Sequence, residues 1–452
     1  MLLVKIIQYS LSRNHPKLLV LLITLILPNA FAQDLSRAQA TDGPSLIPQE
    51  GIALYDREHP VIGYSTQAPI DRFARLGREI ATGKISLNKN STQGYLSDLL
   101  DKLEIDPDSQ TLVYSRTSLN TGLIRANNPR AIYFNDDTYV AWVPGTNVIE
   151  IATMDPNLGP VFYLFDPDSI GIERQAGQCL RCHDSLTLSG GGVPRFILGS
   201  GYTYFNGSLV SHEGWILTDQ ETPIKFRWGG WYVTGQHGKQ VHLGNIVVSK
   251  AEELQDLEQA RIGNINRLDD FFKTELYLTP NSDIDALMVL EHQVQIQNMI
   301  TRVNYDVRNL LVREFTSVMN ESGISQETKT SITEIIEPLV KAMFMVGEAE
   351  VIDSMNGNTG YRNNFEARGP VDSKGRSLRQ LDLESRLFRY PLSYLVYSSE
   401  FKALPGLAKE LIFERFNTIL NGNDTSDSYL HLDENDRLAI YEILTETHPD
   451  FQ

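Results

Sequence analysis

Residues 139–165 read YVAWVPGTNVIEIATMDPNLGPVFYLF, and this stretch decides the fold class. Three runs rich in Val, Ile, Tyr and Phe, at 139–143, 148–154 and 161–165, are separated by turn residues. Such runs between Pro, Gly, Asn and Asp clusters are typical of short antiparallel strands. A further run at 111–115 precedes them. We therefore expect a small antiparallel sheet that leads directly into the segment around residue 180.

Helical periodicity dominates on both sides of this sheet. Residues 69–83 place Ile70, Phe73 and Leu76 on one stripe, as an amphipathic helix does. The later part of the chain predicts a long helix with Ser282 as its N-cap, and the expected helices there are 282–315, 331–346, 383–399, 407–420 and 434–445. The predicted fold class is α+β, with a small antiparallel sheet region around residue 180 and a mainly helical C-terminal part.

The first residues have the order of a secretory signal. Lys5, Arg13 and Lys17 precede an apolar run at 18–27, which is followed by Ala-Phe-Ala at 30–32. The run is shorter than the roughly 20 residues that a spanning helix needs. An uncleaved anchor is the alternative. We expect cleavage after residue 32, export to the periplasm and no stable membrane insertion.

Four regions follow from these patterns. They are a signal peptide at 1–32, an N-terminal α+β region at 33–175, a region at 176–250 with a β-hairpin, and a mainly helical region at 251–452. The hairpin is expected to pair residues 225–235 with 241–249 around a turn at 237–239.

Composition excludes several classes of function. The 452 residues contain 41% hydrophobic and 21% charged residues, which is ordinary globular composition. The formal charge is −17, and removal of three bases with the signal peptide makes it −20. A chain this acidic is repelled by phosphate backbones, so we expect no nucleic-acid partner.

The only two cysteines share one motif. Cys179 and Cys182 are followed by His183, which gives the C-x-x-C-H pattern of covalent haem attachment. Two thiols at this spacing add to the two vinyl groups of haem, and the adjacent imidazole binds the iron as the proximal ligand. An exported chain usually spends its cysteines on disulfides, and this chain has none left for that purpose.

On this motif the chain resembles c-type cytochromes. Residues 130–137, 227–235 and 386–391 extend the similarity to a group of exported bacterial cytochrome c-like proteins. The resemblance implies one covalently bound haem c per chain and export, and it implies no particular reaction.

Two other uses of the cysteines compete with haem attachment. A redox-active C-x-x-C pair does not require the histidine and is usually found near a thioredoxin-like βαβ pattern, which is absent from the sequence. A structural zinc site needs four ligands, and His237 with His242 is the available second pair.

The sixth iron ligand is left open by the sequence. His292 and Met299 lie on an apolar helical stripe, and a histidine there is either a ligand or a satisfied buried imidazole. His237 and His242 follow the motif by some 55 residues and are further candidates. Trp215, Trp228 and Trp231 are candidates for pocket walls, and Arg195 and Arg227 for pairing with haem propionates.

The expected function is therefore redox chemistry at a single haem. The leading interpretation is electron transfer to or from a redox partner protein, or use of the haem on a small-molecule substrate. The alternatives are a peroxidase- or oxygenase-like haem enzyme with an open sixth position, and a haem-bearing sensor or docking module without turnover. The sequence assigns no catalytic residue, and an enzymatic role stays open.

Overall fold

The structure is a computed structural model that describes residues 56–250, 263–317 and 323–451. The predicted signal peptide at 1–32 lies outside the described residues, as do residues 33–55. The described residues all belong to one compact unit by their contacts. The architecture is α+β, as the sequence predicts.

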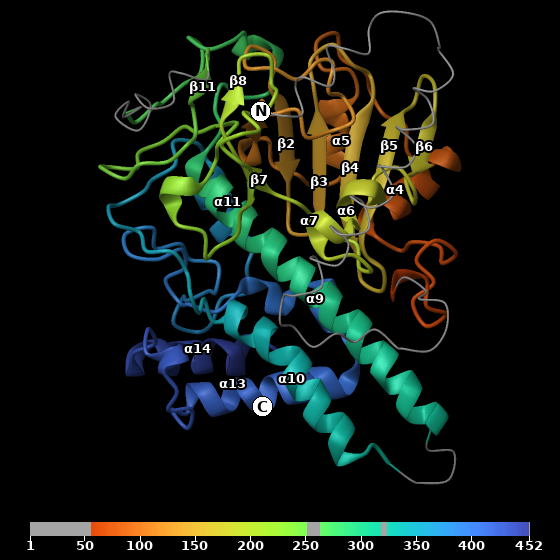
Figure 1. The fold of residues 1–452 in the computed structure, drawn as a ribbon, viewed down its shortest axis with the longest axis vertical. Helices are drawn as coiled ribbons and strands as arrows, with labels where there is room; N and C mark the ends of the chain where they lie inside the picture. Colours follow the sequence, from red (N-terminus) through yellow and green to blue (C-terminus); the bar gives the residue numbers. More distant parts are fainter. Residues whose placement is uncertain (1–55, 251–262, 318–322, 452) are drawn as a thin grey trace, which may run out of the picture. The chain divides into compact units, whose positions relative to one another are not determined.

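A seven-stranded antiparallel sheet forms the centre of this unit (Figure 1). Its strand order is β10-β1-β2-β3-β4-β5-β6, and every neighbouring pair is antiparallel. The strands are β1 (Thr111–Val113), β2 (Arg130–Phe134), β3 (Thr138–Trp142), β4 (Ile149–Asp155), β5 (Gly159–Asp166), β6 (Gly171–Arg174) and β10 (Trp231–Tyr232). The predicted strands at 111–115, 139–143, 148–154 and 161–165 are confirmed, and β2 and β6 were not predicted.

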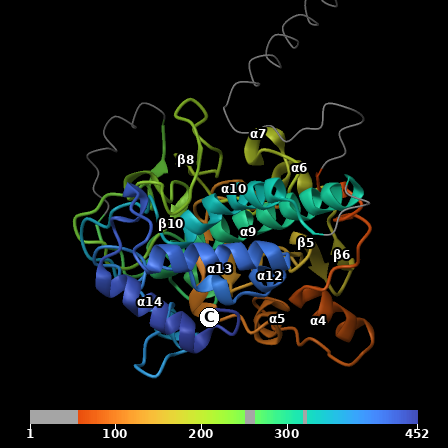
Figure 2. The same ribbon diagram turned by 90° about the horizontal axis from the view of Figure 1, so that it is seen from below.

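Helices cover both faces of the sheet, which is why its central strands are buried almost throughout. Helices α4 (Arg72–Ala81) and α5 (Leu96–Lys102) lie on one face, and the long helix α9 (Ile284–Ser317) lies on the other (Figures 1 and 2). Adjacent side chains of β5 point to opposite faces of the sheet. Tyr163 meets the ring of Phe73 from α4 at 5.1 Å between centroids, whereas Phe162 faces the motif, as described below.

The start of α9 is tied to the edge of the sheet. The Ser282 hydroxyl donates to the carbonyl of Tyr232 at 2.6 Å and accepts the N–H of Leu112 at 3.0 Å. Asp283, not Ser282, caps the helix, because its Oδ1 accepts the N–H of the second helical residue at 2.9 Å. The predicted long helix is confirmed, and its predicted N-cap is displaced by one residue because Ser282 bonds to the sheet.

The predicted hairpin at 225–249 is wrong. Strand β10 pairs with β1 of the main sheet, and β11 (Val247–Val248) pairs in parallel with β8 (Thr203–Tyr204). Asn245 adopts a φ of +68°, and its side chain takes the place of a strand partner by bonding both backbone groups of Val233. The third pair of strands is β7 (Gly199–Ser200) with β9 (Ile216–Leu217).

The C-terminal part is mainly helical. Helix α10 packs against α9 and α13, and α13 packs against α14 (Figure 1). The helices here are α10 (Gln326–Met343), α11 (Tyr361–Glu366), α12 (Ser399–Lys402), α13 (Gly406–Leu420) and α14 (Glu434–Thr447). The helix predicted at 383–399 is wrong: Leu383 has a φ of +58°, Pro391 removes an amide donor, and only a 3-10 turn forms, at Tyr394–Tyr397.

Among the helices that the structure describes, none combines the length and apolar character required to cross a bilayer.

Candidate functional site

The two cysteines lie on a single helical turn. Cys179 is the N-cap residue of α6 (Leu180–His183), and the N–H of His183 donates to the Cys179 carbonyl at 3.0 Å. Residues three apart in a helix are neighbours on its surface, so this turn brings the two thiols to the same side. Both are free thiols, with Cys179 half-buried and Cys182 exposed. The turn therefore presents one exposed and one half-buried thiol beside an imidazole.

The imidazole of His183 is held in one tautomer. Its Nδ1 lies 2.7 Å from the carbonyl oxygen of Arg195, and the Arg195 N–H returns a bond to the His183 carbonyl at 2.8 Å. A carbonyl oxygen only accepts, so Nδ1 carries the proton and Nε2 carries the lone pair. Within the described chain Nε2 has no hydrogen-bond partner. Burial lowers the pKa of His183 to about 4, so the ring is neutral near pH 7.

Strand β5 and helix α9 fix this imidazole in space. The Phe162 ring of β5 lies 4.4 Å from the His183 ring, and Phe196 lies 6.2 Å beyond Phe162. Asn298 of α9 holds Phe196 through both backbone groups, at 2.8 and 2.9 Å. The segment that carries the Arg195 carbonyl is thus anchored to α9, and the His183 ring is restrained by packing as well as by its hydrogen bond.

A buried ion pair anchors the end of α6. Asp184, which directly follows the motif, has a fully buried side chain and pairs with Arg57. The backbone N–H of Arg57 donates to the Gly192 carbonyl at 2.8 Å, so the same residue also holds the glycine loop. Sequence reasoning missed Asp184, Arg57 and Phe162. The only available signal was the position of Asp184 next to the motif.

Three glycines turn the chain after the motif. Gly190, Gly191 and Gly192 have φ values of +78°, +68° and +80°, a region that disfavours other residues. Arg302 of α9 donates to the Gly191 carbonyl at 3.2 Å. Beside this turn the Leu186 side chain is 76% exposed, so apolar surface lies next to the motif.

The environment of the thiols opposes the two alternative uses. Burial raises the pKa of Cys179 to about 12, with further contributions from the charges of Glu150 and Cys182. A redox-active C-x-x-C pair requires a lowered thiol pKa, which is the opposite shift. In the described ranges no group of three or more His, Cys, Asp or Glu side chains is placed to hold a metal ion. The cysteine pair and the histidine pair of the zinc alternative are therefore not brought together.

His292 is fully enclosed by protein partners. Its Nδ1 lies 2.6 Å from Gln220 Oε1 and its Nε2 lies 2.8 Å from Ser393 Oγ, and the side chain has no exposed surface. This arrangement matches the satisfied buried imidazole, the second of the two interpretations that the sequence left open. Burial in this helix is not confined to an apolar stripe, because the neighbouring Glu291 is 3% exposed and pairs with Arg227 at 2.8 Å.

The other candidate ligands are also buried or packed. His237 Nδ1 lies 2.9 Å from the Gln240 carbonyl, and His242 Nδ1 accepts the Gly244 N–H at 3.0 Å. The two rings are 4.6 Å apart, and burial lowers the pKa of His242 to about 3. Strand β10, which precedes this pair, lies well apart from α6 (Figure 2). Met299 of α9 is half-buried and packs against the core.

The two candidate arginines differ in availability. Arg227 is 1% exposed and is committed to Glu291 and to the carbonyls of Thr222 and Gln220. The half-buried guanidinium of Arg195 makes no hydrogen bond or ion pair in the described part of the chain, and its Nε is buried without a partner. Trp228 and Trp231 are core residues, and Trp215 packs against Gly199.

The donor set fits a c-type haem: two free sulfurs on one turn and a neutral imidazole with an unpartnered Nε2. No protein-family model, curated protein or solved structure matches this chain. The functional argument therefore depends on the residues themselves.

Proposed function

We propose that this chain is an exported, periplasmic c-type cytochrome that carries one covalent haem and has a redox role. Cys179 and Cys182 would hold the porphyrin through thioethers, and His183 Nε2 would be the proximal ligand. When bound, haem supplies one-electron Fe(III)/Fe(II) chemistry. The observation that carries the proposal is the hydrogen bond from His183 Nδ1 to the Arg195 carbonyl, because it leaves Nε2 as the atom with the lone pair.

The surrounding residues support this role because they orient the imidazole and place a positive charge near it. A histidine ligand usually donates its second ring N–H to a carbonyl or carboxylate, which fixes the ring and raises its basicity. Arg195 provides that carbonyl, and the Phe162 ring restrains the imidazole plane. The unpaired Arg195 guanidinium is a suitable partner for a haem propionate, since arginine binds carboxylates through two parallel bonds. Arg227 is not suitable, because Glu291 already occupies it.

The hydrogen bonds of the predicted sixth ligands favour a second candidate function, a haem enzyme with an open iron position. Both nitrogens of His292 are engaged, and the proton on His242 Nε2, required because Nδ1 accepts, removes that nitrogen as a donor to iron. A haem without a strong sixth protein ligand has an open position, as a peroxidase- or oxygenase-like enzyme requires. An electron carrier with both axial positions filled by side chains needs Met299, His237 or another residue.

The proposal is tested by making the protein with cytochrome c maturation machinery and recording a pyridine haemochrome spectrum. We expect one haem per chain that survives acid–acetone extraction. The Cys179→Ala/Cys182→Ala variant should lose covalent haem, while His183→Ala should keep the thioethers and change the Soret band. Absence of covalent haem from the wild-type protein would exclude the proposal.

Carbon monoxide and cyanide then separate the two candidate functions. Prompt binding of carbon monoxide to the reduced protein, and of cyanide to the oxidised protein, indicates an open position and favours the enzyme. Slow or absent binding, restored by one of Met299→Ala or His237→Ala, favours the electron carrier and identifies its ligand.

A further inference from the structure

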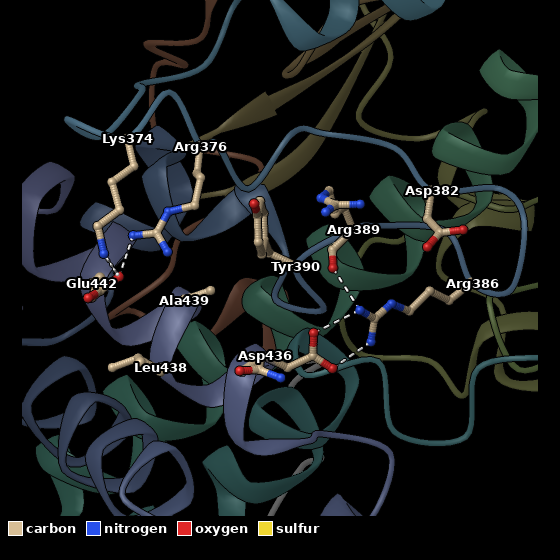
Figure 3. Close-up of a pocket in the computed structure, with 11 residues that line it drawn as sticks. Lys374, Arg376, Asp382, Arg386, Arg389, Tyr390, Asp436, Leu438, Ala439 and Glu442 are labelled. Atoms are coloured by element: carbon tan, nitrogen blue, oxygen red, sulfur yellow. Dashed lines mark hydrogen bonds and ion pairs between the residues drawn. The ribbon is translucent and has the colours of Figure 1, made fainter.

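A polar cavity lies on the other side of α9 from the cysteine motif. It has a volume of about 350 Å³ and opens between the segment 374–390 and the first half of α14 (Figure 3). Helices α14 and α6 are separated by α9 in both views of the ribbon. A cavity of this size accommodates a small organic molecule. Nothing in the haem proposal uses it.

Most charges around the cavity are already paired. Arg386 forms two bonds of 2.8 Å with Asp436. Across the cavity, Lys374 and Arg376 share Glu442, at 2.7 and 2.6 Å. These pairs hold the walls in place and neutralise one another, as the dashed lines in Figure 3 indicate.

Among the described residues, two lining charges form no ion pair: Asp382, whose carboxylate accepts the N–H groups of Glu384 and Ser385 at 2.7 and 3.1 Å, and Arg389, which is the only such cation. Its guanidinium has no ion pair or hydrogen bond within the described residues, and its one interaction is with the Tyr390 ring, 5.9 Å away. Its backbone is fixed, because the Arg389 N–H donates to the Gln380 carbonyl at 2.9 Å and its carbonyl accepts from Arg386 at 2.8 Å. The cavity therefore contains one unpaired cation on a fixed piece of backbone.

Other lining groups are free to bind a polar molecule. No hydrogen bond from the Tyr390 hydroxyl or the Asn435 amide occurs in the part of the chain that the structure describes, and both groups line the cavity. Leu438, which is 58% exposed, adds an apolar patch. A ligand here would meet one cation, two neutral hydrogen-bonding groups and a small apolar surface.

These features restrict the charge of the ligand. The lining contains four cations and the carboxylates of Asp382, Asp436 and Glu442, which leaves a formal charge of +1 in a chain that carries −17. Because only one positive charge of the lining is left uncompensated, it matches a monoanion better than a dianion such as a phosphate ester. A monocarboxylate matches the planar fork of one arginine.

We propose that this cavity binds a small hydroxy- or keto-carboxylic acid. The ligand carboxylate pairs with Arg389, and its hydroxyl or carbonyl oxygens bond to Tyr390 and Asn435. The short carbon chain contacts Leu438. The proposal does not depend on haem attachment, since it concerns a different side of the molecule.

The test is isothermal titration of the mature protein, with and without attached haem, with lactate, pyruvate and gluconate. We expect saturable binding of at least one acid with a Kd of about 1 mM or tighter. Arg389→Gln should weaken it about tenfold or more, the usual effect of removing a charged hydrogen-bond partner. Arg78→Gln, which removes an exposed arginine of α4, should leave it unchanged.

Three outcomes would overturn the proposal: no saturable binding of any of the three acids, equal affinity in Arg389→Gln, or tighter binding of inorganic phosphate than of the acids. Because Arg389 is exposed, loss of binding in its variant is not expected to reflect unfolding. A circular dichroism melt of the variant, matched to the wild-type protein, verifies this.

Discussion

The surroundings of His183 and His292 differ in one decisive respect. Both imidazoles are enclosed enough that burial lowers their pKa, to about 4 and about 3. His292 has a protein partner on each ring nitrogen, whereas His183 has one on Nδ1 alone within the described chain. Burial by itself therefore does not mark a metal ligand. The feature that separates His183 from His292 is a fixed nitrogen on one side of the ring with a free lone pair on the other. His237, whose Nδ1 lies against the Gln240 carbonyl, shares this feature and stays a candidate for the sixth ligand.

The largest expected effect is a loss of stability in the variant His292→Ala. His292→Ala removes two hydrogen bonds, leaves the buried Gln220 Oε1 without its partner and opens a cavity, so we expect the free energy of unfolding to fall by about 3–5 kcal/mol. Urea denaturation monitored by circular dichroism measures it. The matched control is His183→Ala in a haem-free Cys179→Ala/Cys182→Ala background, where one lost bond should cost about 1 kcal/mol. Equal losses of unfolding free energy in the two variants would contradict the proposed difference between the two histidines.

The pH dependence of stability tests the buried carboxyl group of Glu400, which bonds to α9. Burial raises the pKa of Glu400 to about 7, and the side chain accepts a bond from Gln297 of α9 at 3.2 Å. The folded state therefore binds the Glu400 proton more tightly than the unfolded chain does. The stabilisation that this proton provides is complete at acid pH and is lost as the pH rises through 7. Relative to Glu400→Gln, the wild-type protein should lose about 2–3 kcal/mol between pH 5 and pH 8. Parallel denaturation curves for the two proteins at both pH values would contradict this.

Asp184 tests how the motif is anchored. Asp184→Ala removes the buried partner of Arg57 and should lower the free energy of unfolding by about 1–2 kcal/mol. Because Asp184 follows His183, the variant should also lower the fraction of chains that acquire haem, measured by the ratio of Soret to protein absorbance. Arg267→Ala, which breaks an exposed pair with Asp269, is the control and should change neither quantity. Unchanged haem loading in Asp184→Ala would show that the ion pair does not position the motif.

The smallest expected effect is spectroscopic. His242→Ala should leave the Soret band of the haem-loaded protein unchanged, because His242 Nδ1 is bonded to Gly244 and its Nε2 carries the proton. His292→Ala should also leave the band unchanged wherever the variant folds. A shift in either variant would assign that histidine to the iron and contradict the comparison.

Much of the fold followed from local patterns, because the strands of the sheet are alternating or apolar runs bounded by turn residues and because α4, α13 and α14 bury apolar residues at helical spacing. The failures share a cause in long-range contacts. Strand β10 finds its partner in β1, more than a hundred residues earlier, so the nearby 241–249 segment could not be recognised as unpaired. Helix α9 is buried on nearly all sides in its first half, and a stripe analysis assumes one exposed face.

The candidate site also has one part that the sequence predicts and another part that only long-range contacts create. The residues that would attach haem are contiguous, so the sequence alone identifies Cys179, Cys182 and His183. The residues that orient them come from elsewhere: Phe162 from β5 and Arg57 from the first described turn. Neither has a local signature, and only packing brings them to the motif.

The most direct measurement of the central claim is mass spectrometry of a protease digest of the protein recovered from the periplasm. The peptide that contains residues 179–183 should carry one haem, with both sulfurs blocked against alkylation. Recovery of the same peptide with two free, alkylatable thiols and no added mass would contradict the account.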